Sequence, residues 1–282
     1  MPTPLYRSIK VIIMSFAFPE ISPIAVTIPL YFVDVPIRWY ALAYLAGVLV
    51  GWRYLMVLSR RPACRMAPPV LEDFLLPATL SILLGGRLGY VIFYQWPYFS
   101  DHFWNIFKVW QGGMSFHGGL IGMIIGGWWF SRRRALPYLH FTDHLAIVAP
   151  IGIFLGRLAN FVNGELYGRI TDVWWAVRFP AGDYLPRHPS QLYEAALEGV
   201  FLFALLSIMA LFPKIVDRHG LLSGTFLAVY GLARFNVEYF REPDPQLGFV
   251  LGSLSMGQIL CMPLIFFGLV LIVRALQRPK TF

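Results

Sequence analysis

The stretch GRLANFVNGELYG, residues 156–168, closes a strongly apolar segment that begins at Phe141. Arg157 therefore lies in a part of the chain that is suited to cross a lipid bilayer. An arginine near the centre of a membrane helix costs about 2.5–3.5 kcal/mol on insertion scales, and charged residues at that depth usually serve binding or transport. Arg157 is the first candidate functional residue of this chain.

The composition is that of an integral membrane protein. Hydrophobic residues make up 57% of the 282 residues and charged residues 13%, whereas about one quarter of an average soluble domain is charged. The net charge of +8 would suit a nucleic-acid-binding protein, but the basic residues fall in short loops between apolar segments. Membrane topology explains them more simply, and we expect no nucleic-acid partner.

Seven apolar segments predict an all-α, polytopic fold with seven transmembrane helices, because each span needs about 20 apolar residues. The third segment is short and glycine-rich, which favours close helix packing or a re-entrant element. The segments are Ile37–Leu58, Leu71–Tyr94, Ser115–Phe130, Phe141–Asn163, Gln191–Phe212, Leu221–Phe240 and Met256–Val273.

Basic residues follow the first, third, fifth and last of these segments, and the positive-inside rule makes those ends cytoplasmic. The N-terminus is then expected outside and the C-terminus inside, with residues 95–114, 164–190 and 241–255 forming a small periplasmic head. Chemistry is expected on that outer side. The basic residues are Arg60, Arg61, Arg65, Arg132, Arg133, Arg134, Lys214, Arg218, Arg274, Arg278 and Lys280.

Three parts of the chain are expected: an N-terminal extension and interfacial arm over 1–36, a seven-helix membrane domain over 37–273, and a basic cytoplasmic tail over 274–282. The arm begins with a short apolar run and is interrupted by prolines, which suits a segment lying at the membrane surface. Cys64 and Cys261 are isolated, so neither a disulfide framework nor a zinc site is expected.

Arg157, Asn160 and Gly164 lie at i, i+3 and i+7, and a continuous helix would place them on one face. A guanidinium offers planar, bidentate donors that match phosphate, and the amide adds one donor and one acceptor. This arrangement favours an anion site. The alternative is an Arg–Glu pair that joins two helices, although the string carries more polar residues than one such pair requires.

The sixth segment repeats this theme with Tyr230, Arg234 and Glu238 at i, i+4 and i+8. Arg234 and Glu238 could neutralise each other, as charges in membranes usually do. Two inward arginines on separate helices are better explained if they share a phosphate.

Polar residues also share faces of the second and fifth segments. Arg87, Tyr90 and Tyr94 lie on one face, although an aromatic belt explains the tyrosines equally well. The fifth segment carries Gln191, Glu194 and Glu198 on one face, and Glu198 is a candidate structural partner for Arg87 or Arg157.

His117 lies in the glycine-rich string GGMSFHGG, residues 112–119. Histidine suits proton transfer near neutral pH, and a satisfied structural histidine is the equal alternative. The chain contains no GxSxG elbow, HExxH motif, Walker loop or Asp-rich pair, so common hydrolases and metal-dependent transferases lose support, and no metal or other cofactor is expected.

Residues 156–168 match the pattern G-R-x-[GA]-N-F-x-N-x-E-x-x-G in full, and with it the chain resembles the bacterial phosphatidylglycerol:prolipoprotein diacylglyceryl transferases. The resemblance runs from about residue 14 to the seventh segment. Family members tend to begin near Met14, so residues 1–13 are expected to be an extension or a misassigned start. The flanking blocks that agree are IRWY (37–40), GGRLGY (85–90), GGMSFHGG (112–119), HPSQLYE (188–194) and RFNVEYFREPD (234–244).

The resemblance implies an enzyme of the bacterial inner membrane that transfers the diacylglyceryl group of phosphatidylglycerol to the lipobox cysteine of a preprolipoprotein. A thioether forms and glycerol phosphate leaves, which is the first step of lipoprotein maturation. The predicted catalytic residues are His117, Arg157, Tyr230, Arg234 and Glu238. The predicted phosphatidylglycerol-binding residues are Tyr40, Arg87, Tyr90, Arg157, Asn160, Glu165, Gly168 and Arg234.

This reaction needs a nucleophilic thiol and a leaving phosphate whose charge is held. Arg157 and Arg234 suit the second task. For the first, the residues leave open a choice between His117 and an arginine that lowers the pKa of the thiol.

Two other classes of protein compete with this interpretation. A transporter or lipid-binding protein for an anionic amphiphile usually has inverted repeats and paired broken helices, which the sequence does not display. A structural or assembly subunit would not need such a set of inward polar residues.

Overall fold

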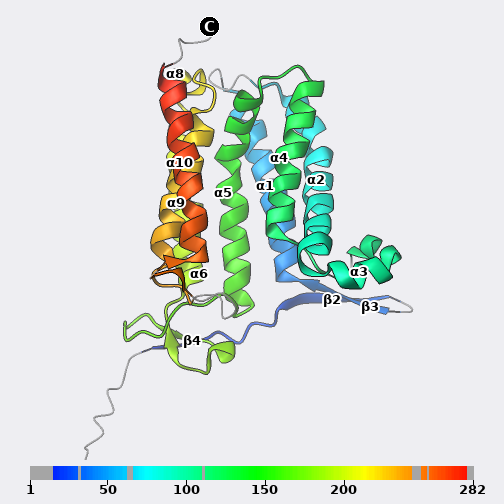
Figure 1. Ribbon diagram of the computed structural model, residues 1–282, viewed down its shortest axis with the longest axis vertical. Helices are drawn as coiled ribbons and strands as arrows, with labels where there is room; N and C mark the ends of the chain where they lie inside the picture. The colour runs from blue at the N-terminus through cyan, green and yellow to red at the C-terminus, as the bar shows by residue number, and fades with distance from the viewer. Residues whose placement is uncertain are drawn as a thin grey trace, which may run out of the picture. The chain divides into compact units, whose positions relative to one another are not determined.

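The computed structural model describes residues 15–30, 33–61, 66–109, 112–242, 249–252 and 254–277. The chain is mostly helical, and each of the seven apolar segments lies largely in helix (Figure 1). Six segments correspond to α1 (Trp39–Leu58), α2 (Pro68–Tyr94), α4 (Phe116–Arg133), α5 (Tyr138–Val162), α9 (Leu221–Val237) and α10 (Met256–Gln277). The fifth segment is divided into α6 (Ser190–Glu194), the π-helix η4 (Ala195–Phe201) and α7 (Leu202–Met209). Short helices are α3 (Trp96–Asp101), η1 (Phe103–Phe107), η3 (Pro180–Gly182) and α8 (Pro213–Val216).

Five helices in the described part of the chain are long and apolar enough to cross a membrane. They are α1, α2, α5, α10 and the continuous helix from Ser190 to Met209. α9 is apolar but has 17 residues, and α4 has 18 residues that include several glycines and two arginines. The protein is therefore a helical membrane protein.

The all-α expectation omitted seven strands that the described residues form. β2 (Ile24–Leu30) and β3 (Val33–Arg38) form an antiparallel hairpin, because residues 24–38 are rich in the β-branched side chains that favour strands. Since Ile37 and Arg38 belong to β3, the first helix begins at Trp39 rather than at Ile37. A three-stranded sheet has the order β1 (Phe16–Ala17), β4 (Val177–Arg178) and β5 (Pro186–Arg187), and β6 (Phe249–Leu251) pairs with β7 (Leu254–Ser255).

The chain divides into two compact units. Unit 1 comprises Met1–Gly47, Gly152–Phe201 and Val229–Ile265, and unit 2 comprises Val48–Ile151, Leu202–Ala228 and Phe266–Phe282. The helices α1, α5, α9 and α10 contribute residues to both units.

Within unit 2, α2 and α4 lie side by side in close contact (Figure 1). A Cβ atom on Gly118 would collide with the carbonyl oxygen of Gly85, and one on Gly122 with that of Ser81. Ser115 caps α4 by accepting a hydrogen bond from the Gly118 amide at 3.2 Å. The glycines of α4 thus allow the two helices to approach closely, which confirms the packing expected from this segment.

Gly122→Ala is expected to destabilise the protein by about 1–3 kcal/mol, because the added methyl group meets the backbone of α2. Gly119→Ala is the matched control in the same helix, since its Cβ would lie 3.6 Å from the Ile82 carbonyl oxygen, an ordinary contact. Thermal unfolding in detergent should show a lower midpoint for Gly122→Ala than for Gly119→Ala. Equal midpoints would contradict this account of the α2–α4 contact.

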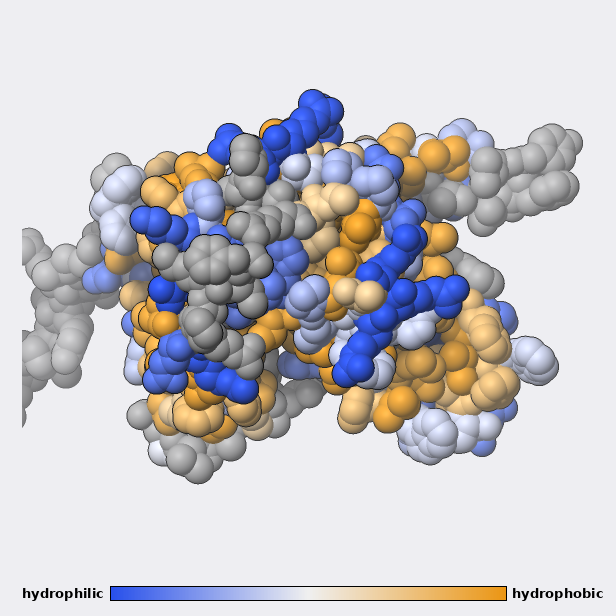
Figure 2. Space-filling view, turned by 90° about the horizontal axis from the view of Figure 1, so that it is seen from above, coloured by the Kyte–Doolittle hydropathy of each residue, from blue (hydrophilic) through white to orange (hydrophobic). Residues whose placement is uncertain are grey.

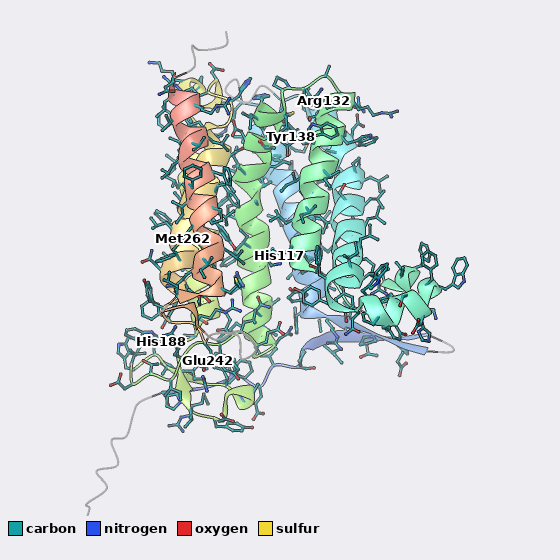
Figure 3. All side chains as sticks on the ribbon, in the orientation of Figure 1. His117, Arg132, Tyr138, His188, Glu242 and Met262 are labelled. Atoms are coloured by element: carbon teal, nitrogen blue, oxygen red, sulfur yellow. The ribbon has the colours of Figure 1, made fainter. Side chains whose placement is uncertain are left out.

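The described members of the basic set predicted to be cytoplasmic gather at one end of unit 2, where α1, α4 and α10 end and α2 begins (Figure 1), and Arg65, Arg278 and Lys280 lie outside the described residues. Figure 2 looks onto this end and shows strongly hydrophilic side chains extending over a largely apolar surface. Arg132, labelled in Figure 3, lies at this end of α4. The described basic residues of this end are Arg60, Arg61, Arg132, Arg133, Arg134, Lys214, Arg218 and Arg274.

Candidate functional site

Three arginines and three glutamates meet in unit 1 and form what we call the Arg–Glu cluster. Its members are Arg157 on α5, Glu194 on α6, Glu198 on η4, Arg234 on α9, and Glu238 and Arg241 just after α9. With three positive and three negative formal charges, the cluster is electrically balanced.

Arg157 binds two carboxylates of the fifth segment. Its Nη1 lies 3.1 Å from Glu194 Oε2, and its Nη2 lies 3.3 Å from Glu198 Oε2. The expected partnership of Glu198 with Arg157 is therefore confirmed. An Arg–Glu contact between two helices, which the sequence offered as the alternative to an anion site, is present as well.

Arg234 binds the other oxygen of Glu194, Oε1, and lies 2.6 Å from Glu238 Oε2 through its Nη2. The i, i+4 pairing of Arg234 and Glu238 is thus confirmed. Glu194 is consequently shared by Arg157 and Arg234, in the position where the sequence predicted a phosphate.

Burial differs between the two kinds of charge in the cluster. The side chains of Glu194 and Glu198 are 0% exposed, whereas those of Arg157 and Arg234 are 18% and 12% exposed. Buried ion pairs contribute little net stability, because the desolvation of both ions offsets their attraction. In a membrane protein, a buried concentration of charges is therefore better explained as a functional site.

The π-helix η4 contributes to the geometry of the cluster. It begins directly after Glu194 and contains Glu198. Gly199 lies against α5, since a Cβ atom there would be 2.7 Å from the Phe154 Cβ atom and 3.0 Å from its Cα atom. This close approach brings both glutamates within reach of Arg157. Single turns of π-helix are frequent at functional sites.

Residues 156–168, which we call the signature string, leave the helix at its C-terminal end. α5 ends at Val162, and Gly164 has φ +66°, a left-handed conformation that glycine adopts readily. Gly164 therefore does not share a helical face with Arg157 and Asn160, and that expectation was wrong. The signal was present in the sequence, because a glycine often stands just after the last helical residue.

Asn160 and Glu165 are joined within this turn. Asn160 Nδ2 donates to Glu165 Oε1 at 2.9 Å, and Asn163 Nδ2 donates to the same oxygen at 3.2 Å. Gln191 Nε2 donates to the Glu165 carbonyl oxygen at 2.6 Å. The string is thereby fastened to α6, the helix that carries Glu194.

Gly168 occupies a tight crossing of three backbone segments. Its amide donates to the His188 carbonyl oxygen at 2.8 Å, and it pairs with Arg241 in an isolated β-bridge. Arg187 Nη1 donates to the Gly168 carbonyl oxygen at 3.2 Å and lies 3.0 Å from Glu242 Oε2. Figure 3 shows His188 and Glu242 in these loops.

Two charged or titratable side chains of these loops have shifted pKa values. Burial lowers the pKa of His188, whose ring lies 3.0 Å from the Tyr193 hydroxyl through Nδ1. Burial and the neighbouring Arg234 lower the pKa of Arg241, which lies 3.5 Å from Glu194 Oε1. Glu194 and Glu238 partly offset this effect on Arg241.

Of the predicted tyrosines of unit 1, Tyr230 interacts with the cluster directly and Tyr40 is linked to it through Tyr44. Tyr230 on α9 interacts electrostatically with Glu198, Arg157 and Arg234. The Tyr40 hydroxyl lies 3.1 Å from that of Tyr44, which in turn interacts electrostatically with Arg157.

Arg87, Tyr90 and His117 belong to unit 2. Arg87 is 5% exposed and does not pair with Glu198. Its guanidinium donates to the carbonyl oxygens of Asn105, Ile106, Lys108, Gly112 and Gly113 and lies 5.1 Å from the Phe99 ring centroid.

The Tyr90 ring stacks on the Tyr94 ring with their centroids 5.8 Å apart, which is consistent with the predicted common face of these two residues. His117 lies in the first turn of α4, where Figure 3 labels it, and the residue is exposed. The structure thus brings together Arg157, Asn160, Glu165, Gly168, Tyr230, Arg234 and Glu238 in unit 1, with Tyr40 joined through Tyr44.

Two members of the cluster had no role in the sequence analysis. Glu194 was placed on a polar face without a partner, and Arg241 was noted only within a matching block. The four-residue spacing of Glu194 and Glu198 placed both on one helix face but named no partner for Glu194. Arg241 lies beyond the end of α9, so helical spacing gave no signal for it.

The fold and the cluster define a class: a polytopic helical membrane protein with an internal site of paired arginines. The sequence pattern of the family described as prolipoprotein diacylglyceryl transferase matches residues 24–274. The chain therefore belongs to the prolipoprotein diacylglyceryl transferase family.

Several curated relatives carry the name phosphatidylglycerol–prolipoprotein diacylglyceryl transferase. The protein from Paramagnetospirillum magneticum is 51% identical over 265 residues, which cover 94% of this chain and 97% of the relative. That from Methylocella silvestris is 51% identical over 267 residues, covering 93% and 96%. That from Azospirillum brasilense is 48% identical over 268 residues, covering 94% and 98%.

Proposed function

We propose that this protein transfers the diacylglyceryl group of phosphatidylglycerol to the cysteine thiol of a prolipoprotein lipobox. The bond between the diacylglyceryl carbon and the phosphate oxygen breaks, a carbon–sulfur bond forms, and glycerol phosphate leaves with the electron pair. Family membership and the names of the relatives support this activity. The observation in the structure that carries it is the pair of partly exposed guanidinium groups, Arg157 and Arg234, fixed on fully buried carboxylates.

Arg157 and Arg234 are assigned to the phosphate of the lipid. Negative charge grows on this group as the carbon–oxygen bond breaks, and donors already held in place stabilise it without reorganisation. A guanidinium has five N–H donors, so contacts with the glutamates leave capacity for phosphate oxygens. Glu238 and Tyr230 complete the proposed catalytic set.

The remaining predicted residues have supporting roles in this proposal. Asn160, Glu165 and Gly168 shape the wall of the site next to Arg157, and Tyr40 and Tyr90 contact the lipid. The five carbonyl contacts of Arg87 favour a role in anchoring residues 105–108 and 112–113 over direct lipid binding.

The acceptor thiol must lose its proton before it attacks. We assign this proton to His117, an exposed residue whose imidazole suits a general base. An arginine that stabilises the thiolate is the alternative.

For the membrane arrangement we propose seven spans in the bacterial inner membrane, with the N-terminus outside, residues 1–36 as an interfacial arm, and residues 274–282 as a cytoplasmic tail. The basic end of unit 2 then faces the cytoplasm, as the positive-inside rule requires. Arg157 and Arg234 both lie near the C-terminal ends of α5 and α9, which finish at Val162 and Val237, whereas the basic loops precede the N-terminal ends of these helices. This supports an active site in the outer half of the membrane.

The function is tested by incubating the purified protein with phosphatidylglycerol in detergent micelles and a synthetic lipobox peptide. The peptide is expected to gain the mass of one diacylglyceryl group. A peptide with serine in place of the lipobox cysteine should gain none. Lipid binding without any mass gain would instead favour a carrier or transporter for anionic amphiphiles.

A further inference from the structure

Glu194 differs from the other carboxylates of the cluster in the number of arginines it contacts. Its Oε2 lies 3.1 Å from Arg157, and its Oε1 contacts Arg234 and lies 3.5 Å from Arg241. By contrast, Glu198 contacts Arg157 and Glu238 contacts Arg234. Glu194 therefore links three arginines that come from α5, α9 and the segment after α9.

Three guanidinium groups so close together repel one another. In a buried site this repulsion is screened weakly, and removing one partner of a buried ion pair leaves an uncompensated charge. A carboxylate between the arginines offsets the repulsion. Because each of its two oxygens lies within ion-pair distance of a different arginine, it also limits the directions in which the guanidinium groups can point.

Glu194 is itself held in a fixed position. The neighbouring Gln191 and Ser190 donate to the carbonyl oxygens of Glu165 and Leu166 at 2.6 and 3.0 Å. All three side chains, Ser190, Gln191 and Glu194, are fully buried. These two hydrogen bonds join the start of α6 to the signature string and so fix the position of the Glu194 carboxylate relative to that string.

We propose that Glu194 is a positioning residue, which orients the guanidinium groups of Arg157, Arg234 and Arg241 toward the phosphate of the lipid substrate. This inference rests on the proposed function. It adds Arg241 as a third cationic group at the phosphate, and it assigns to Glu194 a role in catalysis that acts through the arginines rather than by contact with the reacting atoms.

The test is steady-state kinetics of diacylglyceryl transfer with phosphatidylglycerol and the lipobox peptide varied in turn. Glu194→Gln keeps the length of the side chain but removes its charge. We expect kcat/KM for phosphatidylglycerol to fall about 10- to 100-fold, less than the 10²- to 10³-fold typical of losing a donor that contacts the developing charge, because Glu194 acts through the arginines. The KM for the peptide should stay within about twofold, a split that a general loss of structure would not produce.

Glu194→Asp is the second variant, because it keeps the charge and shortens the reach by one methylene group. It should retain activity between that of the wild type and Glu194→Gln, and it serves as the test if Glu194→Gln does not fold. The matched control is Asp73→Asn, which removes a half-exposed carboxylate paired with Arg134 in unit 2, and it should behave as the wild type.

Wild-type kinetics in Glu194→Gln, or in Glu194→Asp if that is the variant that folds, would overturn the positioning role. The role would also be overturned if kcat/KM fell and KM rose equally for both substrates while the unfolding temperature was lower. If the wild-type protein itself transfers no diacylglyceryl group, the proposed function fails, and this outcome is distinct from the failure of the inference about Glu194.

Discussion

Arg157→Lys is expected to reduce the rate of diacylglyceryl transfer about 10²- to 10³-fold, the loss typical of removing one charge-stabilising donor group. Lysine keeps the positive charge, but its single ammonium cannot contact Glu194 and Glu198 as the two Nη atoms do and also present a fork of donors to a phosphate. The initial rate of mass gain by the lipobox peptide measures this effect.

Arg134→Lys is the matched control for this substitution. Arg134 is 46% exposed and pairs with Asp73, and exposed ion pairs contribute about 1 kcal/mol or less. Its transfer rate should remain within about twofold of the wild type. Wild-type turnover in Arg157→Lys would refute the role of the guanidinium fork at the phosphate.

Arg157→Ala separates the enzyme from a structural subunit. In an enzyme, transfer is lost from protein that is still present in the membrane. In a structural subunit, the same change lowers the amount of folded protein, which is measured by its yield after membrane extraction.

The helices could be predicted from the sequence because long apolar runs have few alternatives in a membrane protein. Phe141–Asn163 was expected as a span, and α5 covers Tyr138–Val162. The strands could not be predicted in the same way, because the prolines of residues 19–36 were interpreted as interruptions. The hairpin accommodates Pro29 and Pro36 within its own strands, which edge strands tolerate.

Contacts of the site could be predicted where they lie within one helix, because periodicity fixes which residues share a face. Arg234 in the last turn of α9 and Glu238 illustrate this case, because the Glu238 amide directly after α9 still donates to the Arg234 carbonyl oxygen four residues earlier. Periodicity does not specify which helices face each other, so the position of Glu194 between Arg157 and Arg234 came from the structure alone. The π-helix after Glu194, which sets the spacing of the two glutamates, has no simple sequence signal.

Gly168→Ala is expected to remove most of the activity, although Gly168 carries no reactive group. A Cβ atom there would collide with the Phe240 carbonyl oxygen and would lie 2.7 Å from both the Cβ atom and the carbonyl oxygen of His188. Two of these three atoms belong to the backbone, so the loops must separate. Because Gly168 pairs with Arg241, the separation moves Arg241 away from Glu194.

A displacement of about 1 Å in a positioned group can cost about 100-fold in rate, and we expect a loss of this order in Gly168→Ala. Gly152→Ala is the matched control, since no described atom outside its own helix and chain neighbours lies within 4 Å of the added Cβ atom. Transfer rates and unfolding midpoints of both variants, measured in the same detergent, distinguish a local shift from general unfolding. Because the collision is confined to one loop crossing, the transfer rate of Gly168→Ala should fall strongly while its unfolding midpoint changes little. A transfer rate equal to that of Gly152→Ala would show that the crossing does not position the cluster.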